Sequence, residues 1–175
     1  MVSRDKNVTT MISLLLVFFI TLGLFQGSFS SALMPMLVVG LSVVWLYGTM
    51  GYLGIPLSTL AGSVAALVIG IGIDYSVHIL NTYRFHRRDN SISEALSEAV
   101  GETGVAIVAT SVTTISAFMA FLSGMMPEMH RFGLIMSIGI GYALLFSFFL
   151  LPSVFVLEEK IMKKIRDSVT WRHDF

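Results

Sequence analysis

Five long apolar runs constrain this chain more than any other feature of its sequence. They extend over residues 11–27, 33–53, 58–83, 103–125 and 132–157. A bilayer core about 30 Å thick requires roughly 17 to 25 apolar residues in a transmembrane helix, and each run is close to that length. Of all residues, 55% are hydrophobic and 13% charged, whereas soluble domains carry about 25% charged residues. The sequence therefore predicts an all-α integral membrane protein, a bundle of five transmembrane helices.

Charge and cysteine content exclude several classes of protein. The formal net charge is zero, which gives no sign of a surface for nucleic acid. The chain has no cysteine, so disulfides, thiolate catalysis and cysteine metal sites are excluded. We expect no cofactor and no nucleic-acid partner, with membrane lipid as the surrounding medium.

The basic residues indicate how the chain lies across the membrane. Lysine and arginine of short loops are retained on the cytoplasmic side. One basic group precedes the fourth run and another follows the fifth: Arg84, Arg87 and Arg88, then Lys160, Lys163, Lys164 and Arg166. Because two spans separate the groups, both can be cytoplasmic. Residues 158–175 are then a cytoplasmic tail and residues 1–10 an extracytoplasmic N-terminal stub, in a plasma or inner membrane. Arg4 and Lys6 favour the opposite orientation by a smaller count.

A short helix is predicted between the third and fourth runs. Ser91 and Glu94 have the spacing of a capping box, in which each side chain bonds to the other residue's backbone N–H. Apolar residues follow at helical intervals from Ile92 to Val100. We expect a short interfacial helix there, and the alternative is a loop with accidental periodicity.

Asp74 is the only carboxylate inside any of the five runs. Placing an ionised group within a membrane costs upward of about 2.5 kcal/mol, so such a residue requires a reason. One reason is function, above all proton transfer, since intramembrane acids commonly mark ion pathways. The other is structural: a protonated or hydrogen-bonded Asp74 would serve packing or insertion, and nothing would be transported.

Small residues recur every four positions along the third run. Gly62, Ala66 and Gly70 form a stripe of the kind that lets membrane helices approach closely. We expect Gly62, Gly70 and Gly72 to be helix-packing glycines.

Polar residues continue this stripe. Asp74 and His78 follow at the same spacing, and Asn81 comes three residues later, which predicts a polar ladder toward the basic cytoplasmic end. Such a ladder could conduct protons, although His78 near the interface can equally be a solvated histidine. A metal would need a third ligand, which the nearby sequence does not offer, so we expect no metal site.

The fourth run carries a cluster of hydroxyl side chains. They belong to Thr110, Ser111, Thr113, Thr114 and Ser116. A hydroxyl within a helix can bond to its own backbone or reach an acid on a neighbouring helix. Both uses stay open from the sequence.

The third run, LSTLAGSVAALVIGIGIDYSVHILNTYR, resembles the fourth membrane helix of a half-repeat in the resistance-nodulation-division (RND) superfamily, particularly its MMPL-type and sterol-sensing-domain-like branch. Three other strings are similar to the same family, in the family's order: YGTMGYLGIPLS, EALSEAVGETGVAIVATSVTTISAF and MHRFGLIMSIGIGYALLFSFFLLPSVF. The resemblance covers nearly the whole chain, and its glycine-rich Asp-Tyr element is the most specific part.

The resemblance implies a transporter of two similar halves, each with one helix, a large extracytoplasmic domain and five more helices. This chain is similar to the last five, so we expect it to begin partway through a larger architecture. In this branch an acid at the Asp74 position, with Tyr75 as its hydrogen-bonding partner, couples proton flow to export of lipids or other amphiphiles. By similarity, Thr110, Thr113 and Thr114 are candidates to face the acid.

We therefore expect the membrane-domain part of a proton-coupled exporter, with a second half-transporter, an extracytoplasmic domain or further copies of the chain as partners. The proton relay would consist of Asp74, Tyr75, His78, Thr110, Thr113 and Thr114. The alternative is a sterol-sensing-domain-like module that binds lipid or acts as a scaffold without transport. An intramembrane aspartyl protease needs two acids, and because only one is present we expect no enzyme.

Overall fold

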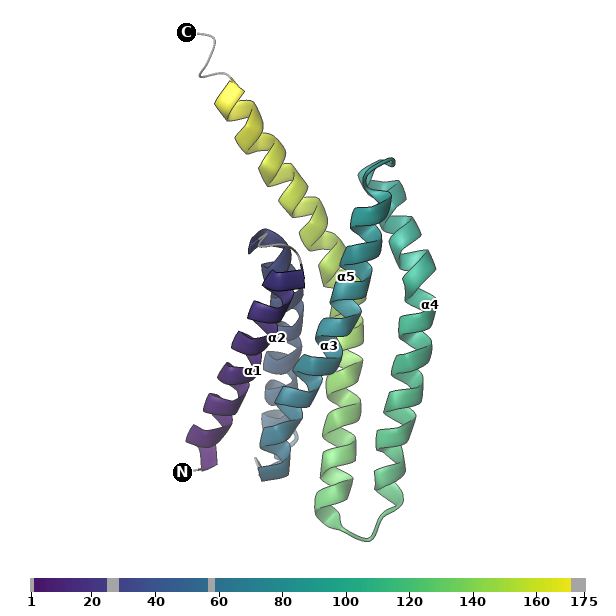
Figure 1. Ribbon diagram of the computed structural model, residues 1–175. Helices are drawn as coiled ribbons and strands as arrows, with labels where there is room; N and C mark the ends of the chain where they lie inside the picture. Colours follow the sequence, from purple (N-terminus) through teal and green to yellow (C-terminus); the bar gives the residue numbers. More distant parts are fainter. Residues whose placement is uncertain (1, 25–28, 57–58, 171–175) are drawn as a thin grey trace.

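The computed structural model describes residues 2–24, 29–56 and 59–170, and side-chain surroundings chiefly for residues 10–20, 33–56 and 63–161. In these ranges the chain forms five α-helices that run up and down along one bundle (Figure 1). They are α1 (Val2–Leu24), α2 (Phe29–Tyr52), α3 (Thr59–His86), α4 (Ile92–Met119), which the short 3₁₀ turn η1 (Ala120–Ser123) extends, and α5 (Pro127–Thr170). The described ranges contain no strand, and the predicted all-α membrane bundle is confirmed.

Four of the described helices are long and apolar enough to cross a membrane. The qualifying stretches are Leu33–Tyr52, Ser63–His86, Ile92–Ser123 and Pro127–Ile161. In α1 the side chains described in an unbroken run are those of residues 10–20, and the apolar stretch that they form, Thr10–Ile20, is shorter than the other four. The fifth span therefore stays a prediction.

The core of the bundle lies along α3, which contacts all four other helices. The seam between α3 and α5 is closed because small residues let the backbones approach. A Cβ atom added at Gly72 would lie 3.0 Å from the Cβ of Ala143, and one added at Gly139 would lie 2.5 Å from Cγ2 of Val68. Deeper in the same seam, the buried hydroxyls of Ser76 and Ser147 hydrogen-bond at 3.1 Å.

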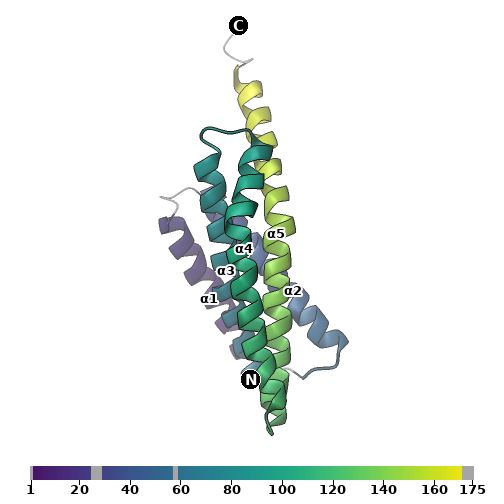
Figure 2. The ribbon, with the colours of Figure 1, turned by 90° about the vertical axis from the view of Figure 1, so that its right-hand side faces the viewer.

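Helix α4 lies at the side of the bundle, against α3 and α5 (Figures 1 and 2). Its buried residues are small or form one stripe at helical spacing: Ala95, Ala99, Gly104, Ile107 and Ser111. Most other side chains of α4 are not covered by the rest of the chain. The helix therefore attaches to the core along a narrow line, as the periodicity of an amphipathic helix dictates.

The helix boundaries depart from the sequence expectation in two places. The capping box of Ser91 and Glu94 is present, with both reciprocal bonds, but the helix that it starts continues to Met119. The prediction of a separate interfacial helix was wrong, because no proline interrupts the segment, and the two glycines in it, Gly101 and Gly104, only weaken a helix. Likewise α5 runs on to Thr170 through the predicted tail, which is rich in good helix formers.

The end of α2 has the glycine that such an end requires. Gly54 adopts φ of 65°, a left-handed conformation that glycine takes without steric cost. The N–H of Ile55 then donates to the carbonyl of Met50 at 3.0 Å, which closes the helix end. The next helix, α3, begins at Thr59.

Candidate functional site

A cavity of about 550 Å³ lies between α3 and α4. It is lined from α3 by Ile71, Asp74, Tyr75 and His78, and from α4 by Glu102, Thr103, Ala106, Ile107, Thr110 and Thr114. The α4 residues recur at intervals of three and four, so they share one face of that helix. The cavity brings together every predicted relay residue except Thr113.

Asp74 and Tyr75 lie on the cavity wall in different surroundings. The Asp74 side chain is exposed to the cavity, and it makes no hydrogen bond or ion pair with any residue that the structure describes. Tyr75 is buried in the core cluster. The hydrogen bond that the resemblance implies between them is absent from the described part of the chain, because consecutive residues of a helix do not face each other.

His78 lines the cavity one turn after Asp74. It is exposed, as Asp74 is, so both side chains can meet water in the cavity. Asn81, the next step of the expected ladder, is exposed but does not line this cavity. Of the expected ladder, Asp74 and His78 therefore line the cavity and Asn81 does not.

The threonines of α4 hydrogen-bond to their own helix. Thr110 Oγ1 lies 3.0 Å from the carbonyls of Ala106 and Ile107, and Thr114 Oγ1 donates to the carbonyl of Thr110 at 2.7 Å. Each hydroxyl oxygen keeps lone pairs that can accept another bond. In this arrangement Thr110 and Thr114 offer acceptors to the cavity, which suits a protonated carboxyl group or water.

Thr113 points elsewhere. Its hydroxyl donates to the carbonyl of Ala109 at 2.9 Å, and its side chain is exposed outside the cavity. Thr113 is three residues after Thr110 and one before Thr114. Because each residue turns the helix by about 100°, Thr113 shares only part of the face on which those two threonines lie. Thr113 is thus the matched hydroxyl outside the site.

Glu102 and Thr103 also line the cavity, and sequence reasoning missed both. The fourth run was expected to begin at Thr103, so Glu102 was assigned to a polar loop. In the structure α4 has already made more than two turns at that point. The available signal was the four-residue spacing of Glu102, Ala106, Thr110 and Thr114.

The predicted packing glycines have different surroundings. A Cβ added at Gly72 would meet Ala143 and Val39, so Gly72 lies in a tight seam. A Cβ added at Gly70 would meet no atom of the described residues within 4 Å, so within this chain Gly70 does not serve a close helix contact. The surroundings of Gly62 lie outside those described.

Charged residues gather at the end of the bundle where α3 turns into α4. Glu159 of α5 accepts bonds from Arg87 Nε at 2.7 Å, from Arg87 Nη2 at 3.0 Å and from the Tyr83 hydroxyl at 2.6 Å. We call Tyr83, Arg87 and Glu159 the α3–α5 clasp. Hydrogen bonding to Glu159 raises the pKa of the Arg87 guanidinium above its ordinary value, so the arginine stays charged.

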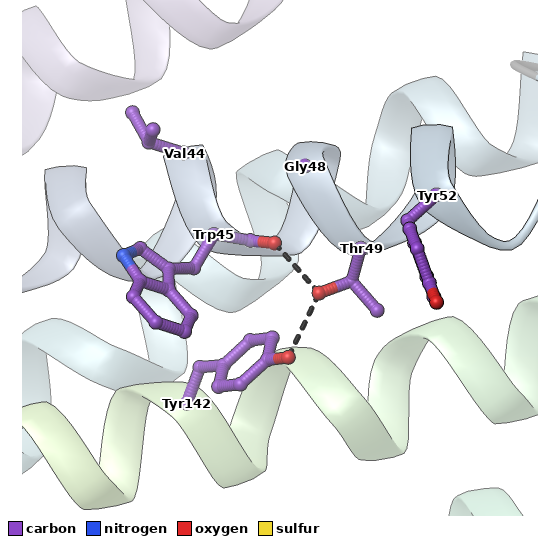
Figure 3. Close-up of a pocket in the computed structure, with 6 residues that line it drawn as sticks. All are labelled: Val44, Trp45, Gly48, Thr49, Tyr52 and Tyr142. Atoms are coloured by element: carbon purple, nitrogen blue, oxygen red, sulfur yellow. Dashed lines mark hydrogen bonds between the residues drawn. The ribbon is translucent and has the colours of Figure 1, made fainter.

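A second cavity, of about 540 Å³, lies between α2 and α5. Its lining is mostly aromatic and apolar: Val44, Trp45, Gly48, Thr49, Tyr52 and Tyr142 (Figure 3). Thr49 donates to the carbonyl of Trp45 at 2.9 Å, so the Tyr142 hydroxyl, 2.8 Å away, is the donor in its bond with Thr49. This cavity contains no titratable acid or base other than tyrosine.

Metal binding finds no support in the described part of the chain. No three His, Asp or Glu side chains there are arranged to hold a metal ion. The polar side chains that line the α3–α4 cavity include the carboxyl groups of Asp74 and Glu102, the imidazole of His78 and the hydroxyls of Thr110 and Thr114.

These features define a class: a multi-pass α-helical membrane domain with an acid-containing polar cavity between its helices. The sequence profile of the MMPL family matches residues 1–174, and the chain belongs to that family. The match agrees with the resemblance to the MMPL-type branch of the RND superfamily.

Several known proteins are similar to this chain. A membrane protein of Methanocaldococcus jannaschii is 34% identical over 161 residues, which is 91% of this chain and 41% of the relative. The probable transport protein MmpL12 of Mycobacterium tuberculosis is 28% identical over 97% of this chain and 15% of its own length. Protein dispatched homolog 3 of Mus musculus is 32% identical over 67% of this chain and 8% of its own length. The chain thus spans less than half of each relative.

Proposed function

We propose that this chain is the membrane-domain part of a proton-coupled exporter of lipids or other amphiphiles, and that Asp74 is its proton-relay acid. The observation that carries the proposal is the α3–α4 cavity, where Asp74, which has no partner among the described residues, lies together with His78 and two threonine hydroxyls. Membership of a transporter family supports the general class.

The mechanism follows from how the two protonation states of Asp74 interact with α4. A carboxylate accepts hydrogen bonds, whereas the protonated group can donate one to the oxygen of Thr110 or Thr114. Because α4 attaches to the core along a narrow stripe, protonation of Asp74 can bias how α4 packs against α3. Proton uptake and release then shift the domain between two packings, and that shift is what drives export.

The test replaces the acid in the complete protein reconstituted with its partners. Asp74→Asn keeps the shape of the side chain and removes its titration, so proton uptake into liposomes, followed with an enclosed pH dye, should cease. Asp89→Asn is the matched control, since Asp89 is exposed in the α3–α4 turn, and it should behave like the unchanged protein. Undiminished proton uptake by Asp74→Asn would refute the proposal.

The proposed orientation places the N-terminus outside and the C-terminus in the cytoplasm of a plasma or inner membrane. In the bundle, the α3–α4 turn with its arginines and the C-terminal part of α5 lie at the same end (Figure 1). Retention of basic residues on the cytoplasmic side favours that end as the inner one. A second half-transporter, an extracytoplasmic domain or further copies of the chain would complete the assembly.

The α2–α5 cavity supports a second candidate, a lipid-binding module without transport. Its apolar and aromatic walls suit an apolar chain or ring, and the Thr49–Tyr142 pair offers a polar contact (Figure 3). For this candidate, a fluorescent lipid analogue should bind the chain with an affinity that Trp45→Ala lowers and Asp74→Asn leaves unchanged. Binding that Trp45→Ala does not weaken would eliminate it.

A further inference from the structure

His86 lies between two carboxylates where α3 ends. Its Nδ1 is 2.7 Å from Oε2 of Glu98, and its Nε2 is 2.8 Å from Oε2 of Glu102. Both distances are within hydrogen-bonding range, and each contact becomes an ion pair when the ring is protonated. The ring therefore connects Glu98 and Glu102 of α4 through its two nitrogens.

One of these glutamates also belongs to the cavity that holds Asp74. Glu102 lines that cavity together with Asp74 and His78, while Glu98 lies one turn further toward the α3–α4 turn. Along α3, His86 is 12 residues after Asp74, a rise of about 18 Å at 1.5 Å per residue. A cavity of about 550 Å³ has room for several waters, and a water needs two or more polar partners to be held in place. Asp74, His78, Glu102 and the threonines supply such partners.

We propose that His86 and Glu102 form the proton-exchange site through which Asp74 communicates with water at the α3–α4 end of the bundle. The inference rests on the proposed function of Asp74 and adds the site at which its proton exchanges, in either direction, with water at that end.

The step balances without any other reactant. Nδ1 of His86 takes a proton from the solvent side or from protonated Glu98, and the Nε2–H bond breaks as its proton passes to the Glu102 carboxylate. The neutral carboxyl group of Glu102 then hands that proton to water in the cavity. His86 is left neutral with its hydrogen on Nδ1, and exchange with water restores the other tautomer, since 22% of its side chain is exposed.

The other contacts around His86 argue against a purely structural role. Glu102 is 65% exposed, and ion pairs at such positions contribute little to stability. The adjacent Arg87 is engaged with Glu159, which already ties α3 to α5. The start of α4 is already held by the capping box and by the bond from Asn90 to Glu98 at 2.8 Å.

The test measures how fast Asp74 is protonated. The 175-residue chain is placed in lipid bilayers and subjected to a pH jump, and the C=O stretch of the protonated Asp74 is followed by time-resolved infrared spectroscopy. The signal is assigned by its loss in Asp74→Asn. A positioned proton carrier accelerates transfer by about 10² or more, so His86→Gln should slow the signal at least about tenfold while its final intensity stays the same. Added imidazole should restore the rate.

His130→Gln is the matched control. His130 lies near the start of α5, at the opposite end of the bundle, where Nε2 contacts the carbonyl of Gly124, so its loss should leave the rate unchanged. If His86→Gln leaves the rate of Asp74 protonation unchanged, or slows it in a way that imidazole does not restore, the inference is overturned while Asp74 stays the relay acid. If the chain without any substitution shows no C=O signal from protonated Asp74, the proposed function and the inference are overturned together.

Discussion

The seam between α3 and α5 differs in kind from the seam between α3 and α4. Toward α5 the seam is closed by Gly72, Gly139 and the buried Ser76–Ser147 hydrogen bond. Toward α4 the same helix presents Asp74 and His78 to a cavity, and α4 is held by one narrow stripe. In the proposed function, α3 and α5 form the frame, and α4 is the element whose packing responds to a proton.

The largest expected effect comes from adding a large side chain to the closed seam between α3 and α5. Gly72→Leu would force a side chain against Ala143 and Val39, and overpacking of this kind costs about 1–3 kcal/mol or more. Gly70→Leu, two residues away on the same helix, enters open space and gains helix propensity of up to about 1 kcal/mol. The free energy of unfolding in detergent, followed by circular dichroism, should fall for the first variant alone. Equal losses for both would contradict the close packing of the α3–α5 seam at Gly72.

A smaller effect concerns the α3–α5 clasp that closes the frame at its charged end. Arg87→Ala removes two bonds to Glu159 at a partly exposed site, so the loss should be about 1 kcal/mol and should shrink at high salt. Arg88→Ala is the control, since Arg88 is exposed and makes no ion pair with the described residues. Unfolding measurements in low and high salt that show no difference between the variants would mean that the clasp does not stabilise the frame.

The smallest expected effect concerns the hydroxyl groups of α4 at the α3–α4 cavity. Thr110→Val removes a hydroxyl oxygen from the cavity, and we expect proton uptake to slow about threefold, which corresponds to about 0.7 kcal/mol. Thr113→Val makes the same change outside the cavity and should have no effect. Rates of dye-reported proton uptake by reconstituted protein distinguish the two. An equal response at Thr113 would show that the hydroxyls act through the helix and not through the cavity.

Much of the fold could be predicted because apolar run length and helix caps are local properties. The capping box at Ser91 and the terminator Gly54 are both visible in the sequence. The seams were less predictable, because the contact made by a glycine depends on the neighbouring helix. Gly139 of α5 approaches α3 more closely than Gly72 approaches α5, yet nothing in the sequence marked it as a packing glycine. Gly70 fits the small-residue stripe of the sequence but lies in open space.

The site was predicted in part for a related reason. Asp74 could be found because a single carboxylate in an apolar run is conspicuous. Glu102 and His86 could not be found in the same way, since polar residues near a helix end are ordinary. Their significance depends on the register between α3 and α4, which only the folded chain shows.

In the proposed function, Asp74 gains and loses a proton inside the bundle. Infrared difference spectra of the chain in bilayers, recorded across the pH range in which it stays folded, test this directly. We expect a C=O band of a protonated carboxyl group that appears on acidification, disappears on return to higher pH and is missing from Asp74→Asn. A spectrum in which Asp74→Asn removes no pH-dependent band would contradict it.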